Sequence, residues 1–211
     1  MASHFGLSVA SAAADTAKGS RVDKGLCTWL DLLVTWNAKH DLTAARSEGE
    51  LLDLMLADAF ALSQHLPQHA RLVDIGSGAG APGLPLALIR PDLAVTLVEP
   101  LAKRVSFLRT VIGALGRLDI KVHHGKAGPL TEAATKWDVA LSRATFAPPE
   151  WLAVGRTLVE PGGSVWVLLA REEAPALEGT TVAEDFAYEW PNQQRARRAV
   201  RYVTGVPDVT A

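Results

Sequence analysis

The 211-residue chain lacks the features that mark secreted and membrane proteins. It has one cysteine, Cys27, so no disulfide bond can form within it. No apolar run reaches the ~20 residues that a membrane-spanning helix needs. Neither sign of charge is in large excess, since the formal net charge is −2 at pH 7. We therefore predict a cytoplasmic protein in a reducing compartment, with no membrane segment, which contacts any nucleic acid through a local basic patch.

Metal-binding patterns and a secretion signal are also missing. The histidines show no ligand spacing with Asp or Cys, so we expect no metal site. Residues 1–20 are small and rich in Ala and Ser, without the basic start and apolar stretch of a secretion signal. We expect them to form a flexible tail.

Two hydrophobic patterns divide the remaining chain. The first predicts helices over residues 24–40 and from Ser47 onward, where Glu50 is placed for a capping box. Farther along, short apolar runs alternate with helical stretches, which predicts a mostly parallel sheet with helices on both faces. We expect residues 21–68 to form an N-terminal helical cap and residues 69–211 the core of a single domain. The expected strands are 71–75, 94–100, 119–125, 137–144, 162–170 and 195–206, and the expected helices among them are 83–90, 102–116 and 149–159.

The most informative segment reads "RLVDIGSGAGAPGLPLALIRPDLAVTLVEP". Asp74 stands at the end of the first strand, and Gly76, Gly78 and Gly80 form the turn after it. In a parallel sheet a ligand binds outside the carboxyl ends of the strands. Glycine there lets backbone N–H groups approach the ligand. Glu99 ends the second strand, where a carboxylate can accept both hydroxyl protons of a ribose.

Three interpretations of this loop compete. A dinucleotide fits the string "GSGAGA", but Pro82 and Pro85 remove N–H groups that a pyrophosphate would need, and little chain is left for a second nucleotide-binding half. S-adenosylmethionine has no phosphate, and we favour it. Asp74 would pair with its ammonium group, the loop N–H groups would bind its carboxylate, and Glu99 would bind its ribose. A purely structural turn is the third alternative.

Four motifs in fixed order extend this interpretation. They are Trp36-Asn37 followed by Leu42-Thr43, the glycine loop with its following proline, K-R-V-x-F-L-R at 103–109, and S-R-A at 142–144. Over residues 26–203 the chain resembles the bacterial glucose-inhibited division protein B family, RsmG. That resemblance implies a class I (Rossmann-like) methyltransferase fold with a seven-stranded sheet. It also implies transfer of a methyl group from S-adenosylmethionine to guanine N7 of 16S ribosomal RNA.

The implied reaction needs few catalytic groups. Guanine N7 has a lone pair and no proton, so no general base is required, and positioning and electrostatics remain. The implied partner is ribosomal RNA or the 30S particle, and we expect a monomer. Carried over by position, the donor-binding residues are Asp74, Gly76, Ser77, Gly78, Gly80, Glu99, Pro100, Lys126, Ala127 and Arg143. Arg143 is also the expected catalytic residue, and the expected RNA-binding residues are Asn37, Lys103, Arg104, Arg109, Arg197 and Arg198.

The chain departs from the family at several positions. Leu54 and Met55 replace an Arg-His pair, Gly128 replaces a glutamate, Leu169 replaces a lysine, and Pro100 replaces a serine. These changes leave open a methyltransferase of the same fold with another acceptor, or a non-catalytic relative that binds S-adenosylmethionine.

The densest basic run gives a weaker signal. It lies on the expected last strand and comprises Arg195, Arg197, Arg198 and Arg201. Alternating charge is also typical of an exposed edge strand protected against aggregation. RNA binding and a solvated edge therefore remain alternatives for this run.

Overall fold

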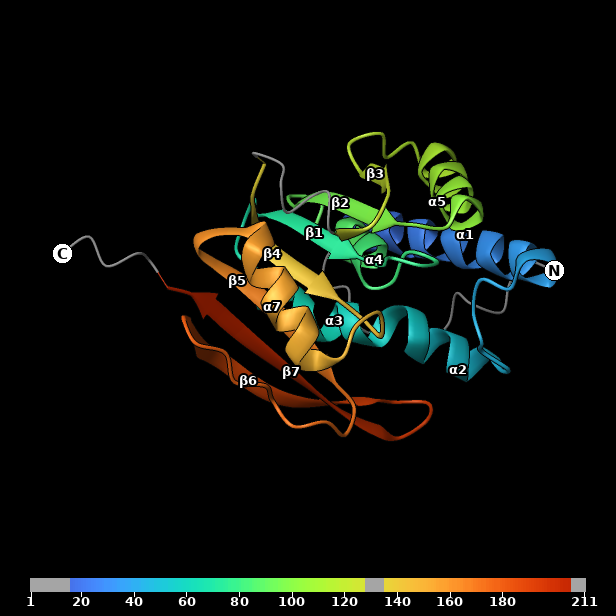
Figure 1. Cartoon of the computed structure of the whole chain (residues 1–211). Coiled ribbons are helices and arrows are strands. Elements are labelled where there is room, and N and C mark those ends of the chain that lie inside the picture. Colours follow the sequence, from blue (N-terminus) through green and yellow to red (C-terminus); the bar gives the residue numbers. More distant parts are fainter. Residues whose placement is uncertain (1–15, 128–134, 206–211) are drawn as a thin grey trace.

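The structure, a computed structural model, describes residues 16–127 and 135–205. Within them, seven strands form one sheet in the order β3-β2-β1-β4-β5-β7-β6 (Figure 1). The strands are β1 Arg71–Ile75, β2 Ala94–Glu99, β3 Lys121–His124, β4 Trp137–Ser142, β5 Val159–Leu169, β6 Thr180–Trp190 and β7 Arg195–Thr204. The helices are α1 Thr16–His40, α2 Glu48–Leu52, the π-helical turn η1 Asp53–Ala57, α3 Asp58–Ser63, α4 Gly83–Ile89, α5 Ala102–Leu115 and α7 Pro148–Leu158.

Strand directions confirm the predicted architecture. Strands β1 to β5 pair in parallel, and β7 runs antiparallel to both β5 and β6. The strand order reverses at β1, which lies between β2 and β4. Ligands of such sheets bind at this switch point. Helix α1 begins at Thr16, inside the expected tail, and residues 1–15 lie outside the described residues.

Strand β6 departs from the expected element order, and its presence changes the position of β7. Because β6 pairs along almost all of β7, the arginine-rich strand is an inner strand, and its expected position at an exposed edge is wrong. The register of β6 shifts between Val182 and Glu184, and the charged Glu184 stands at a half-buried position. This irregularity breaks the two-residue apolar period by which a strand is recognised.

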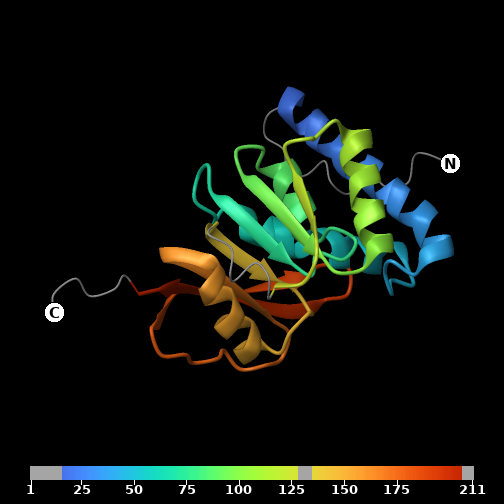
Figure 2. The same ribbon diagram turned by 45° about the horizontal axis from the view of Figure 1, so that its top comes forward.

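Alternate residues of the central strands supply two apolar layers. Leu72 and Leu97 belong to the layer under α1, α3, α4 and α5, whereas Val73 and Val98 belong to the layer under α7. Figure 2 shows α7 on one side of the sheet and the α1 and α5 helices on the other. Both faces of the central strands β1, β2, β4 and β5 are therefore largely buried, as parallel strands require.

Two local signals in the sequence are confirmed. Ser47 caps α2, since its Oγ accepts a hydrogen bond from the N–H of Glu50 at 3.2 Å. The Glu50 carboxylate in turn accepts from the N–H of Arg46 at 2.7 Å, one residue before the position expected of a capping box. Helix α5 ends at Gly116, which has the left-handed φ of 64° typical of this position.

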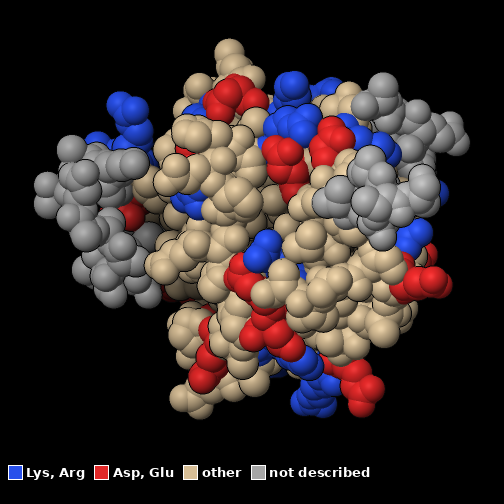
Figure 3. Space-filling view, turned by 90° about the vertical axis from the view of Figure 1, so that its left-hand side faces the viewer, with Lys and Arg blue, Asp and Glu red and all other residues tan. Residues whose placement is uncertain are grey.

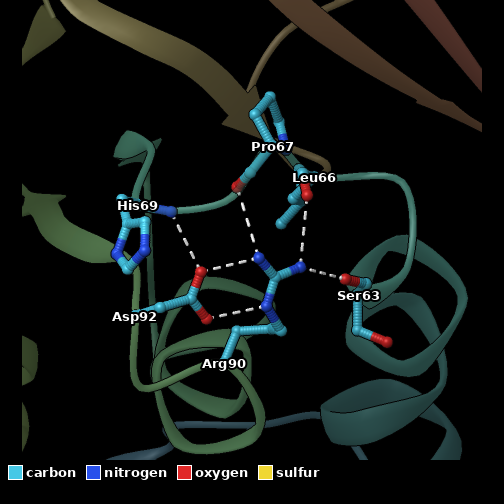
Figure 4. Close-up of polar contacts among 6 residues, drawn as sticks. All are labelled: Ser63, Leu66, Pro67, His69, Arg90 and Asp92. Carbon is cyan, nitrogen blue, oxygen red and sulfur yellow. Dashed lines mark hydrogen bonds and ion pairs between the residues drawn. The ribbon is translucent and has the colours of Figure 1, made fainter.

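A polar cluster joins the end of α4 to the loop that leads into β1 (Figure 4). Arg90 Nη1 donates to the carbonyls of Ser63 at 2.7 Å and Leu66 at 3.2 Å. Its Nε and Nη2 donate to Asp92 at 2.8 and 2.7 Å, and Asp92 also accepts from the N–H of His69 at 3.0 Å. The Arg90 hydrogen bonds hold the pKa of Asp92 well below its usual range. This cluster fixes the approach to the first strand.

The turn between β6 and β7 is fastened to η1 by a buried carboxylate. Asp53 is 1% exposed, and its Oδ1 accepts from the backbone N–H and side-chain amide of Asn192 at 3.1 and 2.9 Å. Its Oδ2 accepts from the N–H of Gln193 at 2.8 Å. Hydrogen bonds to a charged acceptor are stronger than neutral ones. Asp53 therefore links the helices before β1 to the far end of the sheet.

Charged side chains are interspersed by sign on the side shown in Figure 3. An example of such pairing is Arg71, whose guanidinium lies 2.7 Å from Asp138 and 3.5 Å from Glu160. No helix in the described part of the chain is long and apolar enough to cross a membrane. Over residues 16–127 and 135–205, no three His, Cys, Asp or Glu side chains gather in a way that could hold a metal ion.

We predict that Asp53→Ala lowers the free energy of unfolding by about 1–3 kcal/mol, because it leaves the amides of Asn192 and Gln193 without their acceptor. The control is Asp185→Ala, which removes a solvated ion pair with Arg198 and should change stability by about 0–1 kcal/mol. Denaturant-induced unfolding measures both. Equal effects of the two substitutions would contradict the proposed fastening.

Candidate functional site

The glycine loop between β1 and α4 is held by both backbone polar groups of Val98 in β2. The Val98 carbonyl accepts from the N–H groups of Gly76 at 2.8 Å and Ser77 at 3.1 Å. The Val98 N–H donates to Ser77 Oγ at 3.1 Å, and that hydroxyl donates to the carbonyl of Asp74 at 2.8 Å. The loop thus continues the pairing of the sheet beyond the end of β1.

Helix α1 supports the loop from the other side. The indole N–H of Trp29, a fully buried residue, donates to the carbonyl of Ala79 at 2.9 Å. Gly76 and Gly78 remain half-buried, whereas Ser77, Ala79 and Gly80 are buried. The backbone at Gly76 and Gly78 is therefore the part of the loop that a ligand can approach.

The carboxyl group of Asp74 lies behind the loop. It is fully buried; its Oδ2 accepts from the N–H of Gly83 at 3.0 Å, and its Oδ1 has no partner among the described residues. Burial raises the pKa of Asp74 to about 7, although the Gly83 N–H and the positive charge of Arg143 oppose the shift. A cation bound nearby would favour the ionised form. Asp74 can therefore gain or lose its proton near neutral pH, depending on the charges around it.

Glu99 bridges the loop and the start of α5. Its Oε2 accepts from the N–H of Gly78, and its Oε1 from the N–H of Leu101, both at 2.9 Å. The side chain is almost completely buried. Each carboxylate oxygen can accept a second hydrogen bond, but Glu99 is 1% exposed and does not line the cleft that opens over the loop, so its interaction with two ribose hydroxyl groups stays a prediction.

A cleft of about 480 Å³ opens over the loop at the carboxyl ends of β1 and β4. Its walls come from the loop before α2, from η1, from the loop after β4, and from the ends of β5, β6 and β7. Three arginines and two acids stand along it: Arg104, Arg143, Arg197, Asp58 and Glu172. The cleft therefore lies where the sheet topology places a ligand, with a cationic lining.

Arg143 is tied across this cleft to the helices before β1. Its Nη1 donates to the carbonyl of Leu54 and to Asp58 Oδ2, the latter at 3.0 Å. Asp58 Oδ1 accepts from the hydroxyl of Tyr188 and the indole N–H of Trp190, both at 2.8 Å. The side chains of Asp58 and Arg143 are 3% and 19% exposed. This shielded pair fixes the guanidinium and leaves its other nitrogens without a partner among the described residues.

Burial and the neighbouring Asp58 charge raise the pKa of Tyr188 well above its usual range. The hydroxyl therefore stays protonated and remains a hydrogen-bond donor. Tyr188 and Trp190 are functional candidates that the sequence did not reveal. They lie about 130 residues from Asp58, and both belong to the strand that the apolar pattern does not identify.

The structure brings some expected RNA-binding residues together and leaves others apart. Arg104 and Arg197 line the cleft, and Arg197 also stacks on Trp190, with 3.9 Å from its guanidinium carbon to the ring centre. Lys103 and Arg109 are exposed and do not line it. Arg198 instead pairs with Asp185 at 2.5 Å.

Asn37 has an internal partner. Its Oδ1 accepts from the N–H groups of Leu42 and Thr43, at 2.7 and 2.9 Å, and both of these residues line the cleft. Asn37 therefore shapes the cleft wall from behind, because its carbonyl oxygen holds the turn after α1.

The expected donor-binding residues fall into two groups. Gly76, Ser77, Gly78 and Arg143 line the cleft, whereas Asp74, Gly80, Glu99, Pro100, Lys126 and Ala127 do not. Pro100 and Lys126 are exposed and Ala127 is buried. Gly128, one of the departures from the family, lies outside the described residues. Three other departures, Leu54, Met55 and Leu169, line the cleft and make part of its wall apolar.

We predict that Gly76→Ala destabilises the protein by more than about 1–2 kcal/mol, because Gly76 has a φ of 74° and an added Cβ would lie 2.1 Å from Thr145 Oγ1. Thr145→Ala in the same chain should restore part of the loss. Gly113→Ala, in α5 with open space around it, should stabilise by about 0.5–1 kcal/mol. Denaturant unfolding of all variants is the measurement, and a neutral Gly76→Ala would refute the close approach.

Solved structures share this fold at low sequence identity. A methyltransferase from Pyrococcus furiosus matches with a TM-score of 0.55 and 16% identity, over 87% of this chain and 99% of that one. TrmN from Thermus thermophilus matches with a TM-score of 0.54 and 20% identity, over 80% and 53% of the two chains. A mutant of MtNAS in complex with S-adenosylmethionine matches with a TM-score of 0.57 and 17% identity, over 89% and 76%. These likenesses confirm the predicted class I methyltransferase fold.

Proteins related by sequence have higher identity to this chain than these structures do. Ribosomal RNA small subunit methyltransferase G of Myxococcus xanthus is 38% identical over 72% of this chain and 71% of its own length. The protein of the same name from Anaeromyxobacter dehalogenans is 35% identical over 82% and 85%, and that of Xanthomonas axonopodis is 36% identical over 83% and 84%. The GidB family model, described as rRNA small subunit methyltransferase G, matches residues 23–193. The chain therefore belongs to the rRNA small subunit methyltransferase G family.

Proposed function

We propose that this protein transfers a methyl group from S-adenosylmethionine to guanine N7 of 16S ribosomal RNA. The observation that carries the proposal is the continuity of one site. The glycine loop and Glu99 form its donor side, and the arginine-lined cleft opens directly over the loop. Family membership supports both the donor and the ribosomal acceptor.

The donor side fits S-adenosylmethionine by its chemistry. Gly76 and Gly78 offer accessible backbone at the loop, and an added Cβ at Gly78 would meet no other side chain. Glu99, fixed by two backbone N–H groups, has lone pairs left for ribose hydroxyls. The ammonium and sulfonium of the donor would favour the ionised form of Asp74, whose negative charge behind the loop is opposite in sign to theirs. When bound, S-adenosylmethionine supplies an activated methyl group.

The acceptor side needs to position a base and to tolerate positive charge. N7 carries a lone pair and no proton, so the chain needs no general base at this step. Arg143 is the residue best placed to hold the base or its phosphate, as guanine-reading arginines do. Asp58 compensates its charge, so that the cationic donor does not meet an unpaired guanidinium. Arg143 is thus fixed in place before the acceptor arrives.

A second candidate function keeps the fold and the donor but changes the acceptor. It is favoured by the apolar cleft wall, where Leu54, Met55 and Leu169 stand at positions of polar residues in the family. An apolar wall would stack on a base without reading its edge. The two candidates therefore differ in which nucleoside of the RNA receives the methyl group.

The main proposal also includes a role for each part of the chain, an oligomeric state and a cellular location. Residues 21–68 act as a cap that forms one wall of the cleft, and the remaining residues form the donor-binding core. We propose that the protein works as a monomer. Ribosomal RNA as acceptor places it in the cytoplasm.

We predict that Glu99→Gln weakens binding of S-adenosylmethionine about ten- to a hundredfold. A hydrogen bond to a charged group contributes roughly 1.5–3 kcal/mol, and the substitution removes the charge of the acceptor. Glutamine retains one acceptor for the loop, which limits damage to the fold. Calorimetry with the donor measures the change. The control is Glu178→Gln, an exposed residue whose carboxylate, unlike that of Glu99, makes no hydrogen bond to the glycine loop; this variant should bind the donor normally. Unchanged affinity of Glu99→Gln would remove the ribose assignment.

We also expect the protein to methylate small-subunit RNA in 30S particles. Particles lacking the modification are incubated with the protein and methyl-labelled donor, and N7-methylguanine is located by nucleoside analysis and primer extension after chemical cleavage. Label in N7-methylguanine at one position supports the main proposal. Label in another nucleoside supports the second candidate. Donor binding without transfer to any RNA would contradict both.

A further inference from the structure

A second hollow of about 630 Å³ adjoins the cleft at the far end of the sheet. Two segments line it: the turn after β5, Ala170–Glu172, and residues 194–197 at the start of β7. Three of its lining residues, Ala170, Glu172 and Arg197, also line the cleft. The two hollows therefore adjoin at these residues, and an extended chain leaving the cleft on this side could reach the second hollow, which we call the arginine groove.

The groove has an excess of positive charge. Arg171, Arg195 and Arg197 line it, together with one acid, Glu172. Neither Arg171 nor Arg195 has a carboxylate of a described residue within 4.0 Å. By contrast, Arg198 and Arg201, farther along the same strand, lie 2.5 and 2.7 Å from Asp185 and Glu184. Unpaired arginines are thus concentrated at the end of β7 that meets the cleft.

The single acid of the groove is satisfied by the backbone. Glu172 Oε2 accepts from the N–H groups of Ala170 and Arg171, at 2.7 and 3.0 Å. These hydrogen bonds, with the nearby Arg197 charge, hold its pKa below the usual range. Glu172 therefore stays ionised and closes the turn that carries Arg171. The groove keeps two formal positive charges in excess, from three guanidinium groups and one carboxylate.

Arg197 stands at the boundary between the two hollows. Its guanidinium stacks on the Trp190 ring, and its Nη1 donates to the carbonyl of Ala196 at 3.0 Å. Trp190 is itself anchored to Asp58 in the cleft wall. The boundary arginine is therefore oriented by packing, whereas Arg171 and Arg195 are exposed at the surface.

We propose that the arginine groove binds the phosphates of the RNA strand next to the nucleotide that occupies the cleft. This inference rests on the proposed function, and it names where the flanking strand lies. Guanidinium groups match phosphate oxygens in two-pronged geometry. A shallow, exposed groove that continues from the cleft fits a strand passing through, since phosphates repeat along the backbone. Contacts of this kind position the strand without reading its sequence.

The experiment measures the salt dependence of RNA binding. The probe is a small-subunit RNA fragment that the unmodified protein binds, titrated over a series of potassium chloride concentrations. Each lost phosphate contact with a single strand lowers the slope of log K against log salt by about 0.7. We expect this decrease for Arg171→Ala and for Arg195→Ala, and about twice as much for the double variant. Affinity for S-adenosylmethionine should not change, because neither residue lines the cleft.

The matched control is Arg156→Ala. Arg156 is also exposed and donates only to the carbonyl of Glu178 among the described residues, but it lies on α7, away from both hollows. We expect its slope to equal that of the unmodified protein. An unchanged slope for the double variant, or an equal decrease for Arg156→Ala, would contradict RNA binding by the arginine groove and leave the proposed function intact. Failure of the unmodified protein to bind small-subunit RNA both as free fragments and in 30S particles would overturn the proposed function itself.

Discussion

The carboxylate of Asp58 joins the three parts of the chain that surround the cleft. It belongs to the helices before β1, and it accepts from Arg143 after β4 and from Tyr188 and Trp190 in β6. A buried carboxylate is tolerated only with such partners, because an unpaired charge in the interior is strongly destabilising. The position of Arg143, the spacing of the walls and the orientation of Trp190 all depend on this one group.

The same interaction explains how a cationic cleft can accept a cationic donor. Arg143 is compensated by Asp58, and Asp74 adds a further acid behind the glycine loop. The guanidinium groups of Arg104 and Arg197 have no such partner among the described residues, and they stand at other parts of the cleft lining. Arg143 is thus compensated where it stands, whereas Arg104 and Arg197 keep positive charge along the cleft that no described carboxylate pairs.

Much of the fold could be predicted because its signals are local. Six strands, the helix caps at Ser47 and Gly116, and the glycine loop each follow from residues near in sequence. Strand β6 could not be recognised, because a charged Glu184 and a register shift interrupt its apolar period. Without β6, the prediction put β7 at the edge of the sheet, which is wrong. An inner strand and an edge strand differ only in a neighbouring strand, and the sequence of the strand itself does not show that neighbour.

The residues of the candidate site likewise divide into those that local sequence signals predict and those that they do not. Asp74, Glu99 and the loop glycines lie at ends of adjacent strands, where topology alone brings them together. Arg143 was found by its motif, but its partner Asp58 is 85 residues away in sequence, and no local pattern connects them. The family resemblance implies an RNA-binding role for Asn37, which stays a prediction, and the structure adds an internal role, because its carbonyl oxygen shapes the cleft wall.

The π-helical turn η1 has a consequence for the alignment of the two halves of the molecule. Asp53 and Asp58 are five residues apart, and in a regular α-helix that step amounts to about 500°, which would leave them roughly 140° apart around the axis. The wider turn, with its i to i+5 pattern, lets both acids face the same β-hairpin. A regular α-helix with the same five-residue spacing could not present both acids to the hairpin. The π-helical turn therefore keeps Asp53 and Asp58 on one face of the helical segment, and this shared face sets how that segment and the hairpin fit together.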